Sequence, residues 1–292
     1  MMMMAGLVLL PSCLEEEDPL AQLDTIDDNT LDANLVTEVS SESVMETSYE
    51  EMDLITDESI NNVFRMTTGA QDNRGPRINC ADITHDTLNN LITIDFGLGC
   101  EDHRGAIRSG VITIAFDGAP RKPGSSRVIT FNDFYIDSIK VEGTRTLTIL
   151  EDTTSNQSAL IMTSKLEGGK LTFADGTFIT RDAEHSRMTT RGENIGEGTT
   201  TLTGEASGML RNGENYSSTI IEPVVFVRGC EEQAPVSGIK EFAAGTHQRM
   251  IDFGDGACDN LAEVTTDGVT ETIELQGRRR FRETRDQPKN GG

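Results

Sequence analysis

Apolar and polar residues alternate with a period of two through much of the chain after about residue 91. Clear runs occur at residues 91–96, 110–116 and 170–173. Successive side chains of a strand point to opposite faces, so this pattern predicts strands with one apolar face. Many of these strands pair Thr or Ser with aliphatic residues, and we therefore expect the other face to lie in water.

Short turn signals separate the alternating runs. Gly or Asx-Gly pairs flanked by β-forming residues are typical of two-residue hairpin loops. The pattern predicts a mainly β fold, in which an antiparallel meander forms a large curved sheet or an open barrel or sandwich. The long segments 128–150 and 198–227 favour extended ribbons. The candidate turns are Gly168-Gly169, Asp175-Gly176, Asn212-Gly213 and Asp267-Gly268.

A different period precedes the strands. Apolar residues between positions 45 and 63 fall near one side of a helix with 3.6 residues per turn. Ser43 and Glu46 fit a capping box at its start. We therefore predict one N-terminal amphipathic helix from about residue 43 to residue 64, docked on the sheet. Its apolar stripe consists of Met45, Tyr49, Met52, Ile60 and Val63.

The net charge of −24 is unevenly distributed. Residues 14–64 contain sixteen Asp and Glu and no Lys or Arg, and residues 14–40 predict a flexible acidic tether. Residues 277–292 contain six basic and two acidic side chains and predict a disordered tail; contact with phosphate or lipopolysaccharide is the alternative. A strongly acidic chain repels polyanions, so nucleic acid is not an expected partner.

The chain begins with an apolar run of about ten residues, the length of a signal-peptide core and too short to span a bilayer. Residues 1–12 are therefore predicted to be a signal peptide. Leu10, Ser12 and Cys13 resemble the lipobox of bacterial lipoproteins, in which the cysteine receives a lipid. Pro11 and the lack of a basic residue before the run depart from that pattern. An apolar N-terminus with an incidental cysteine is the alternative.

The residues after Cys13 bear on the compartment. Leu14 is not the Asp associated with inner-membrane retention, and residues 15–18 resemble the acidic surface-export signal of lipoproteins in one group of Gram-negative bacteria. This resemblance implies a lipid anchor, such as palmitate, that holds residues 13–68 and the following domain at the outer membrane and the cell surface. The segment 252–260 resembles uncharacterised β-rich lipoproteins of that group, which implies no activity. A solvated linker is the alternative interpretation of the acidic run.

Once Cys13 is assigned to a lipid, four cysteines remain. An even number in an exported chain indicates disulfides, and of three connectivities we favour Cys80–Cys100 with Cys230–Cys258. A zinc site is the rival interpretation, but no two of these cysteines have a C-x2-4-C spacing.

Residues 94–102 recur, with one insertion, as residues 251–259. Each copy has an earlier Cys, and Gly110-Val111 matches Gly268-Val269 further on. The β domain, residues 69–276, is therefore predicted to contain two related units at about 80–116 and 230–275. Each would consist of a strand ending in Asp-Phe-Gly, a bend, a cysteine staple and a hairpin.

The second copy of the repeat gathers oxygen-bearing side chains. Asp252, Asp255, Asp259 and Asn260 lie within nine residues and make a weak calcium candidate. The spacing does not fit an EF-hand, and tight turns favour the same residues. No other metal site and no cofactor is expected.

No recognised catalytic motif is present in the sequence. His85-Asp86, His103 and Glu184-His185 place histidines beside carboxylates, but neighbours on a strand face opposite sides. The absence of Trp disfavours a glycan platform. We expect a non-catalytic binding or structural module for an unknown protein or small-molecule ligand. An apolar-ligand or lipid carrier with a half-barrel cavity and a hydrolase are the alternatives.

Overall fold

The computed structural model describes residues 28–67, 69, 74–102, 105–119, 122–152, 159–190, 198–227, 230 and 234–275. The chain divides into two compact units, Met1–Leu35 and Val36–Gly292. The predicted signal peptide, Cys13, His103 and the basic tail lie outside the described residues. Within these residues, no helix is long and apolar enough to cross a membrane.

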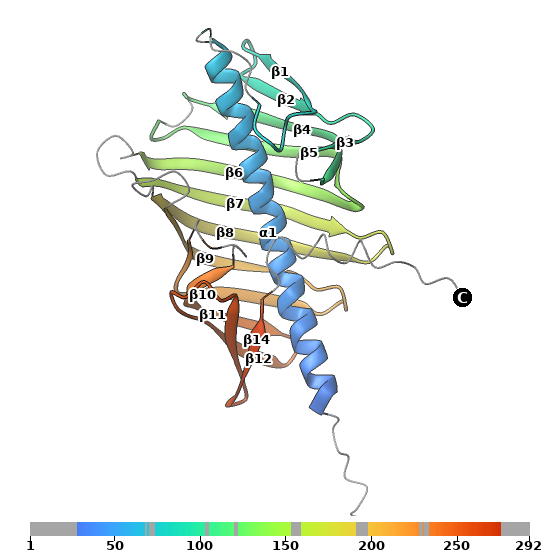
Figure 1. The fold of residues 1–292 in the computed structure, drawn as a ribbon, viewed down its shortest axis with the longest axis vertical. Helices are drawn as coiled ribbons and strands as arrows, with labels where there is room; N and C mark the ends of the chain where they lie inside the picture. Colours follow the sequence, from blue (N-terminus) through green and yellow to red (C-terminus); the bar gives the residue numbers. More distant parts are fainter. Residues whose placement is uncertain are drawn as a thin grey trace, which may run out of the picture. The chain divides into compact units, whose positions relative to one another are not determined.

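The second unit contains one antiparallel sheet, in which the strands follow one another in chain order (Figure 1). The prediction of a mainly β meander is thereby confirmed, and the sheet is open, with β1 and β14 at its ends. β3 stands aside from this order and pairs with β4. The strands are β1 (Asp82–Asp86), β2 (Leu91–Asp95), β3 (Cys100–Glu101), β4 (Ile107–Asp117), β5 (Ser126–Ile136), β6 (Ile139–Asp152), β7 (Ala159–Thr172), β8 (Phe178–Thr190), β9 (Thr199–Met209), β10 (Asn215–Val227), β11 (Pro235–Ala244), β12 (His247–Asp255), β13 (Leu261–Thr266) and β14 (Val269–Glu274).

The N-terminal helix, α1 (Asp28–Thr67), is longer than the sequence pattern indicates. The tether prediction for residues 28–40 and the capping box at Ser43 are wrong, because these residues lie within the helix. Residues 28–40 lack a sustained apolar period, so the sequence pattern does not predict this part of the helix.

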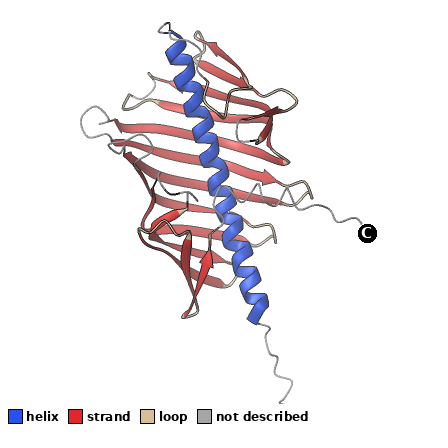
Figure 2. Cartoon of the chain, in the orientation of Figure 1, coloured by secondary structure: helices blue, strands red, loops and turns tan. Residues whose placement is uncertain are grey.

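From Val36 onward, α1 lies across the strands on one face of the sheet (Figures 1 and 2). This inner face is apolar: Ile94, Ile114, Ile129 and Leu147 are buried there with the predicted stripe of the helix, whose five residues are all buried. Burial of this stripe is the main source of the helix's stability.

The opposite, outer face carries many hydroxyl groups. Thr113 and Thr130 are partners in register on β4 and β5, and their hydroxyl oxygens lie 2.5 Å apart. Thr265 and Thr270 form a similar pair, 2.8 Å apart, on β13 and β14. One face of the sheet is therefore wet, as the alternation of Thr and aliphatic residues predicts.

Three of the four predicted turns join consecutive strands: Asp175-Gly176, Asn212-Gly213 and Asp267-Gly268. Gly168-Gly169 does not, because it lies inside β7 at a bulge opposite Gly143 of β6. The Tyr49 hydroxyl donates a hydrogen bond to the Glu142 carbonyl and accepts one of 2.9 Å from the Lys170 amide. The helix thus satisfies two backbone groups at the place where the bulge interrupts the ladder.

The two disulfides, Cys80–Cys100 and Cys230–Cys258, are the pairs that the sequence favours. In each, one cysteine precedes a hairpin and the other follows it: β1–β2 in the first unit and β11–β12 in the second.

The repeat itself is structural. Asp95 accepts a hydrogen bond from the Gly97 amide at 2.7 Å, and Asp252 accepts one from the Gly254 amide at 2.9 Å. The more distant match fails, since Gly110 lies inside β4 and Gly268 lies in the β13–β14 turn. The shared unit is therefore a stapled hairpin with an Asx turn.

Candidate functional site

Carboxylates flank the apolar stripe of α1 on both sides. At 100° per residue, Glu42, Glu46, Asp53 and Asp57 lie along one side and Glu51 and Glu58 along the other. Basic residues of the inner face and of the segment before β1 meet both rows. The helix–sheet interface is thus an apolar seam bordered by ion pairs, which we call the ionic border.

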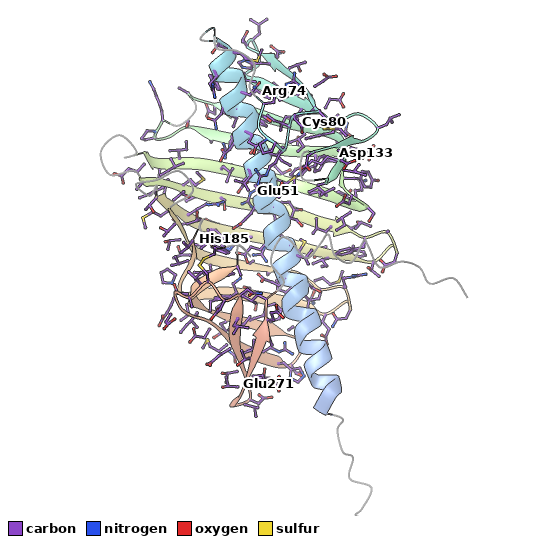
Figure 3. The ribbon with its side chains drawn as sticks, in the orientation of Figure 1. Glu51, Arg74, Cys80, Asp133, His185 and Glu271 are labelled. Atoms are coloured by element: carbon purple, nitrogen blue, oxygen red, sulfur yellow. A yellow bond between two sulfur atoms is a disulfide. The ribbon has the colours of Figure 1, made fainter. Side chains whose placement is uncertain are left out.

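On one side, Glu51, labelled in Figure 3, joins the segment before β1 to strand β4 in the first stapled unit. Its Oε1 lies 2.8 Å from Arg77 Nε and 2.9 Å from Arg108 Nη2. Arg108, with a side chain 2% exposed, also binds Asp102 at 2.6 Å, and Arg77 binds Glu58 at 2.6 Å. Arg77 lies shortly before Cys80, and Asp102, which pairs with Arg108, lies shortly after Cys100, so the disulfide links the two segments that position these arginines at the helix.

On the other side, Asp53 makes a bidentate pair with Arg145 of β6. Both bonds, Nε to Oδ1 and Nη2 to Oδ2, are 2.7 Å long. Arg187 of β8 lies 3.4 Å from the same carboxylate. Burial alone would raise the pKa of Asp53, but Arg145 and Arg187 lower it, so the carboxylate is charged.

Nearer the helix start, Glu42 and Glu46 meet Lys240 of β11 and Arg181 of β8. Glu42 lies 2.7 Å from Arg181 Nη1, and Glu46 lies 2.9 Å from Lys240 Nζ. Burial would raise the pKa of Glu46, but the charges of Lys240 and Arg181 lower it to about 2. The contacts of Lys240 join residues almost two hundred positions apart in sequence.

His185 lies on the inner face of β8 and is buried among these charges (Figure 3). Burial lowers its pKa, and Arg181 lowers it further, to about 4. Its neighbour Glu184 is exposed on the outer face, so the two do not form a dyad. The ring is therefore neutral at pH 7, enclosed under the helix.

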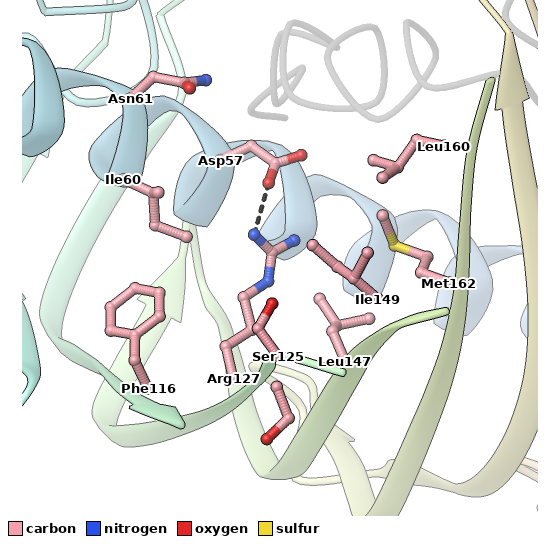
Figure 4. Close-up of a pocket in the computed structure, with 11 residues that line it drawn as sticks. Asp57, Ile60, Asn61, Phe116, Ser125, Arg127, Leu147, Ile149, Leu160 and Met162 are labelled. Carbon is pink, nitrogen blue, oxygen red and sulfur yellow. Dashed lines mark hydrogen bonds and ion pairs between the residues drawn. The ribbon is translucent and has the colours of Figure 1, made fainter. Parts of the chain in front are cut away.

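A pocket of about 50 Å³ opens beside the last ion pair of the border (Figure 4). Asp57 of α1 lies 2.6 Å from Arg127 Nη1 of β5 at its polar end. The side chain of Asp57 is 45% exposed and that of Arg127 is 14% exposed. The apolar lining is formed by Ile60, Phe116, Leu147, Ile149, Leu160 and Met162, and Asn61, Ser125 and Ser126 complete it.

The calcium candidate residues serve as turn residues. Asp252 and Asp259 accept hydrogen bonds from the amides of Gly254 and Leu261, and Asn260 donates to the Leu275 carbonyl at 3.2 Å. Asp255 ends β12. In the described part of the chain, no three His, Cys, Asp or Glu side chains are grouped so that they could hold a metal ion. The geometry therefore supports turn chemistry at this loop.

Comparison of the chain with protein-family models, curated proteins and solved structures finds no match.

The basic residues of the border were not predicted, although the sequence carries a signal for them. Arg145 shares a strand face with Leu147, and Lys240 shares one with Phe242. Cations at apolar positions of strands, together with an acidic amphipathic helix, indicate buried ion pairs between the two.

Proposed function

We propose that this protein is a lipid-anchored module of the outer membrane, held at the cell surface through Cys13, that acts as a non-catalytic binding or structural surface. The observation that carries the proposal is the docking of α1. Its apolar side chains pack on the inner face of the sheet from β2 to β9, and buried ion pairs hold it there. A partner would therefore meet the outer, hydroxyl-bearing face.

Two features favour this proposal over the alternatives. A carrier of whole lipids needs a ligand cavity of roughly 300–1,000 Å³, whereas the pocket that described residues form beside Arg127 measures about 50 Å³. A hydrolase needs a His or carboxylate pair open to substrate. His185 is only 9% exposed and is surrounded by structural ion pairs.

The anchor is tested by expressing the full chain and its Cys13→Ala variant in a Gram-negative host. We expect the parent protein in the outer-membrane fraction, accessible to protease on intact cells, and the variant in the soluble fraction. The Cys80→Ser/Cys100→Ser double variant is the matched control, because it loses two sulfurs but keeps Cys13 and should stay in the membrane. Retention of Cys13→Ala in the membrane would defeat the proposal.

A further inference from the structure

The pocket beside Asp57 and Arg127 combines an apolar lining with one cationic end. Phe116, Leu160 and Ile149 come from three different strands, and Ile60 comes from the helix. Side chains in protein interiors usually close such gaps completely. Here the gap opens next to a guanidinium, which is the arrangement that an anion with a short hydrocarbon chain would fit.

Arg127 has binding capacity beyond its contact with Asp57. A guanidinium carries five N–H donors in a planar fork that matches a carboxylate. Its Nη1 bonds Asp57 Oδ1 at 2.6 Å, and the other terminal nitrogen points toward Ile149 (Figure 4).

Asp57 differs from the other carboxylates on its side of the helix. The side chains of Asp53 and Glu42 are 6% and 5% exposed, so moving either one would strand a buried cation. The side chain of Asp57 is 45% exposed and can turn into water at little cost. The carboxylate of Asp57 thus occupies a place that a ligand carboxylate could take over.

We propose that this pocket binds a short-chain monocarboxylate. The carboxylate pairs with Arg127 in exchange for Asp57, and the hydrocarbon chain lies against Phe116, Leu160 and Met162. The volume of about 50 Å³ limits the enclosed part to a few carbons. The ligand class is therefore that of butyrate and hexanoate.

The test is calorimetric titration of the purified full-length chain with sodium hexanoate at pH 7, beside butyrate and 1-hexanol. We expect hexanoate to bind with a millimolar dissociation constant. 1-Hexanol should bind at least about tenfold more weakly, because it lacks the charge. Hexanoate should bind more tightly than butyrate, by up to about fourfold for each additional methylene that the pocket encloses. Equal affinity for hexanoate and 1-hexanol, or no binding of hexanoate, would overturn the proposal.

Two charge variants give opposite expected results. Asp57→Asn removes the competing carboxylate and should tighten hexanoate binding several-fold. Arg127→Gln should abolish it. Leu160→Phe fills the pocket without changing its charge and should weaken hexanoate binding. This variant tests the proposal independently if Arg127→Gln does not fold.

Asp175→Asn is the matched control, because Asp175 lies 2.6 Å from Arg211 in an exposed pair remote from the pocket, and it should leave binding unchanged. Unchanged or weaker binding by Asp57→Asn would contradict the exchange mechanism. These binding results are independent of the Cys13 anchor, which is tested by cell fractionation.

Discussion

The Asp53 carboxylate binds two guanidinium groups, those of Arg145 and Arg187. This difference in the number of partners predicts which of two variants, one at Asp53 and one at Arg145, is less stable. Removing its charge leaves both Arg145 and Arg187 without their carboxylate, whereas removing Arg145 leaves Asp53 with Arg187. Breaking a buried pair costs about 3–5 kcal/mol. We therefore expect Asp53→Asn to lower the free energy of unfolding more than Arg145→Met, as measured by urea denaturation. Equal losses would show that Arg187 contributes nothing.

His185 makes stability depend on pH. Burial and Arg181 lower its pKa from 6.5 to about 4, so the unfolded chain takes up a proton at a higher pH than the folded one. Stability is fully present above about pH 6.5 and is lost as pH falls toward 4, by up to about 3 kcal/mol.

His185→Gln should remove this part of the pH profile in urea midpoints measured between pH 7 and pH 4. Glu46 and Asp53 have lowered carboxylate pKa values, so their own losses on acidification should persist in the variant. An unchanged slope over pH 6.5–4 would assign the acid sensitivity to those carboxylates.

At the scale of elements, two glycines with the same φ of 83° occupy different surroundings. A Cβ at Gly110 would lie 1.9 Å from the Asp133 carbonyl oxygen at the β4–β5 bulge, while one at Gly176 would have nothing within 4 Å. Gly176→Ala should cost about 1–2 kcal/mol from its left-handed backbone. Gly110→Ala should cost about 1–3 kcal/mol more because of the clash. Similar urea midpoints for the two variants would contradict a rigid bulge.

Turns with a local cause were predictable from the sequence, whereas features that depend on distant contacts were not. The Asp175-Gly176 turn has a local cause, since an Asx-Gly pair suits a tight loop wherever it occurs, and it was predictable. Gly168-Gly169 carries the same local signal but forms a bulge, because the Tyr49 hydroxyl from a distant helix satisfies the backbone there. The pair Glu42–Lys240 was not predictable for the same reason: it depends on where the helix crosses the strands.

At the scale of the whole molecule, the helix and the sheet stabilise each other unevenly. The main apolar cluster joins α1 to the strands from β2 to Ala206 on β9. Among the described side chains, the helix carboxylates reach as far as Lys240 on β11. Arg77 and Arg108 therefore bind the first stapled unit to the helix. The second stapled unit is bound to α1 by ion pairs at its first strand, β11.

This unevenness predicts the order in which the sheet opens. Strands β12–β14 contribute no residue to the apolar cluster around α1, so their amides should exchange with solvent through openings of lower free energy than those of β4–β8. Native-state hydrogen exchange followed by mass spectrometry measures this difference. Because Cys230–Cys258 closes the β11–β12 hairpin, the Cys230→Ser/Cys258→Ser variant should lose protection in β11–β14 and keep it in β4–β8. Uniform protection along the sheet, or a uniform loss in the variant, would mean instead that the helix binds all the strands into one cooperative unit.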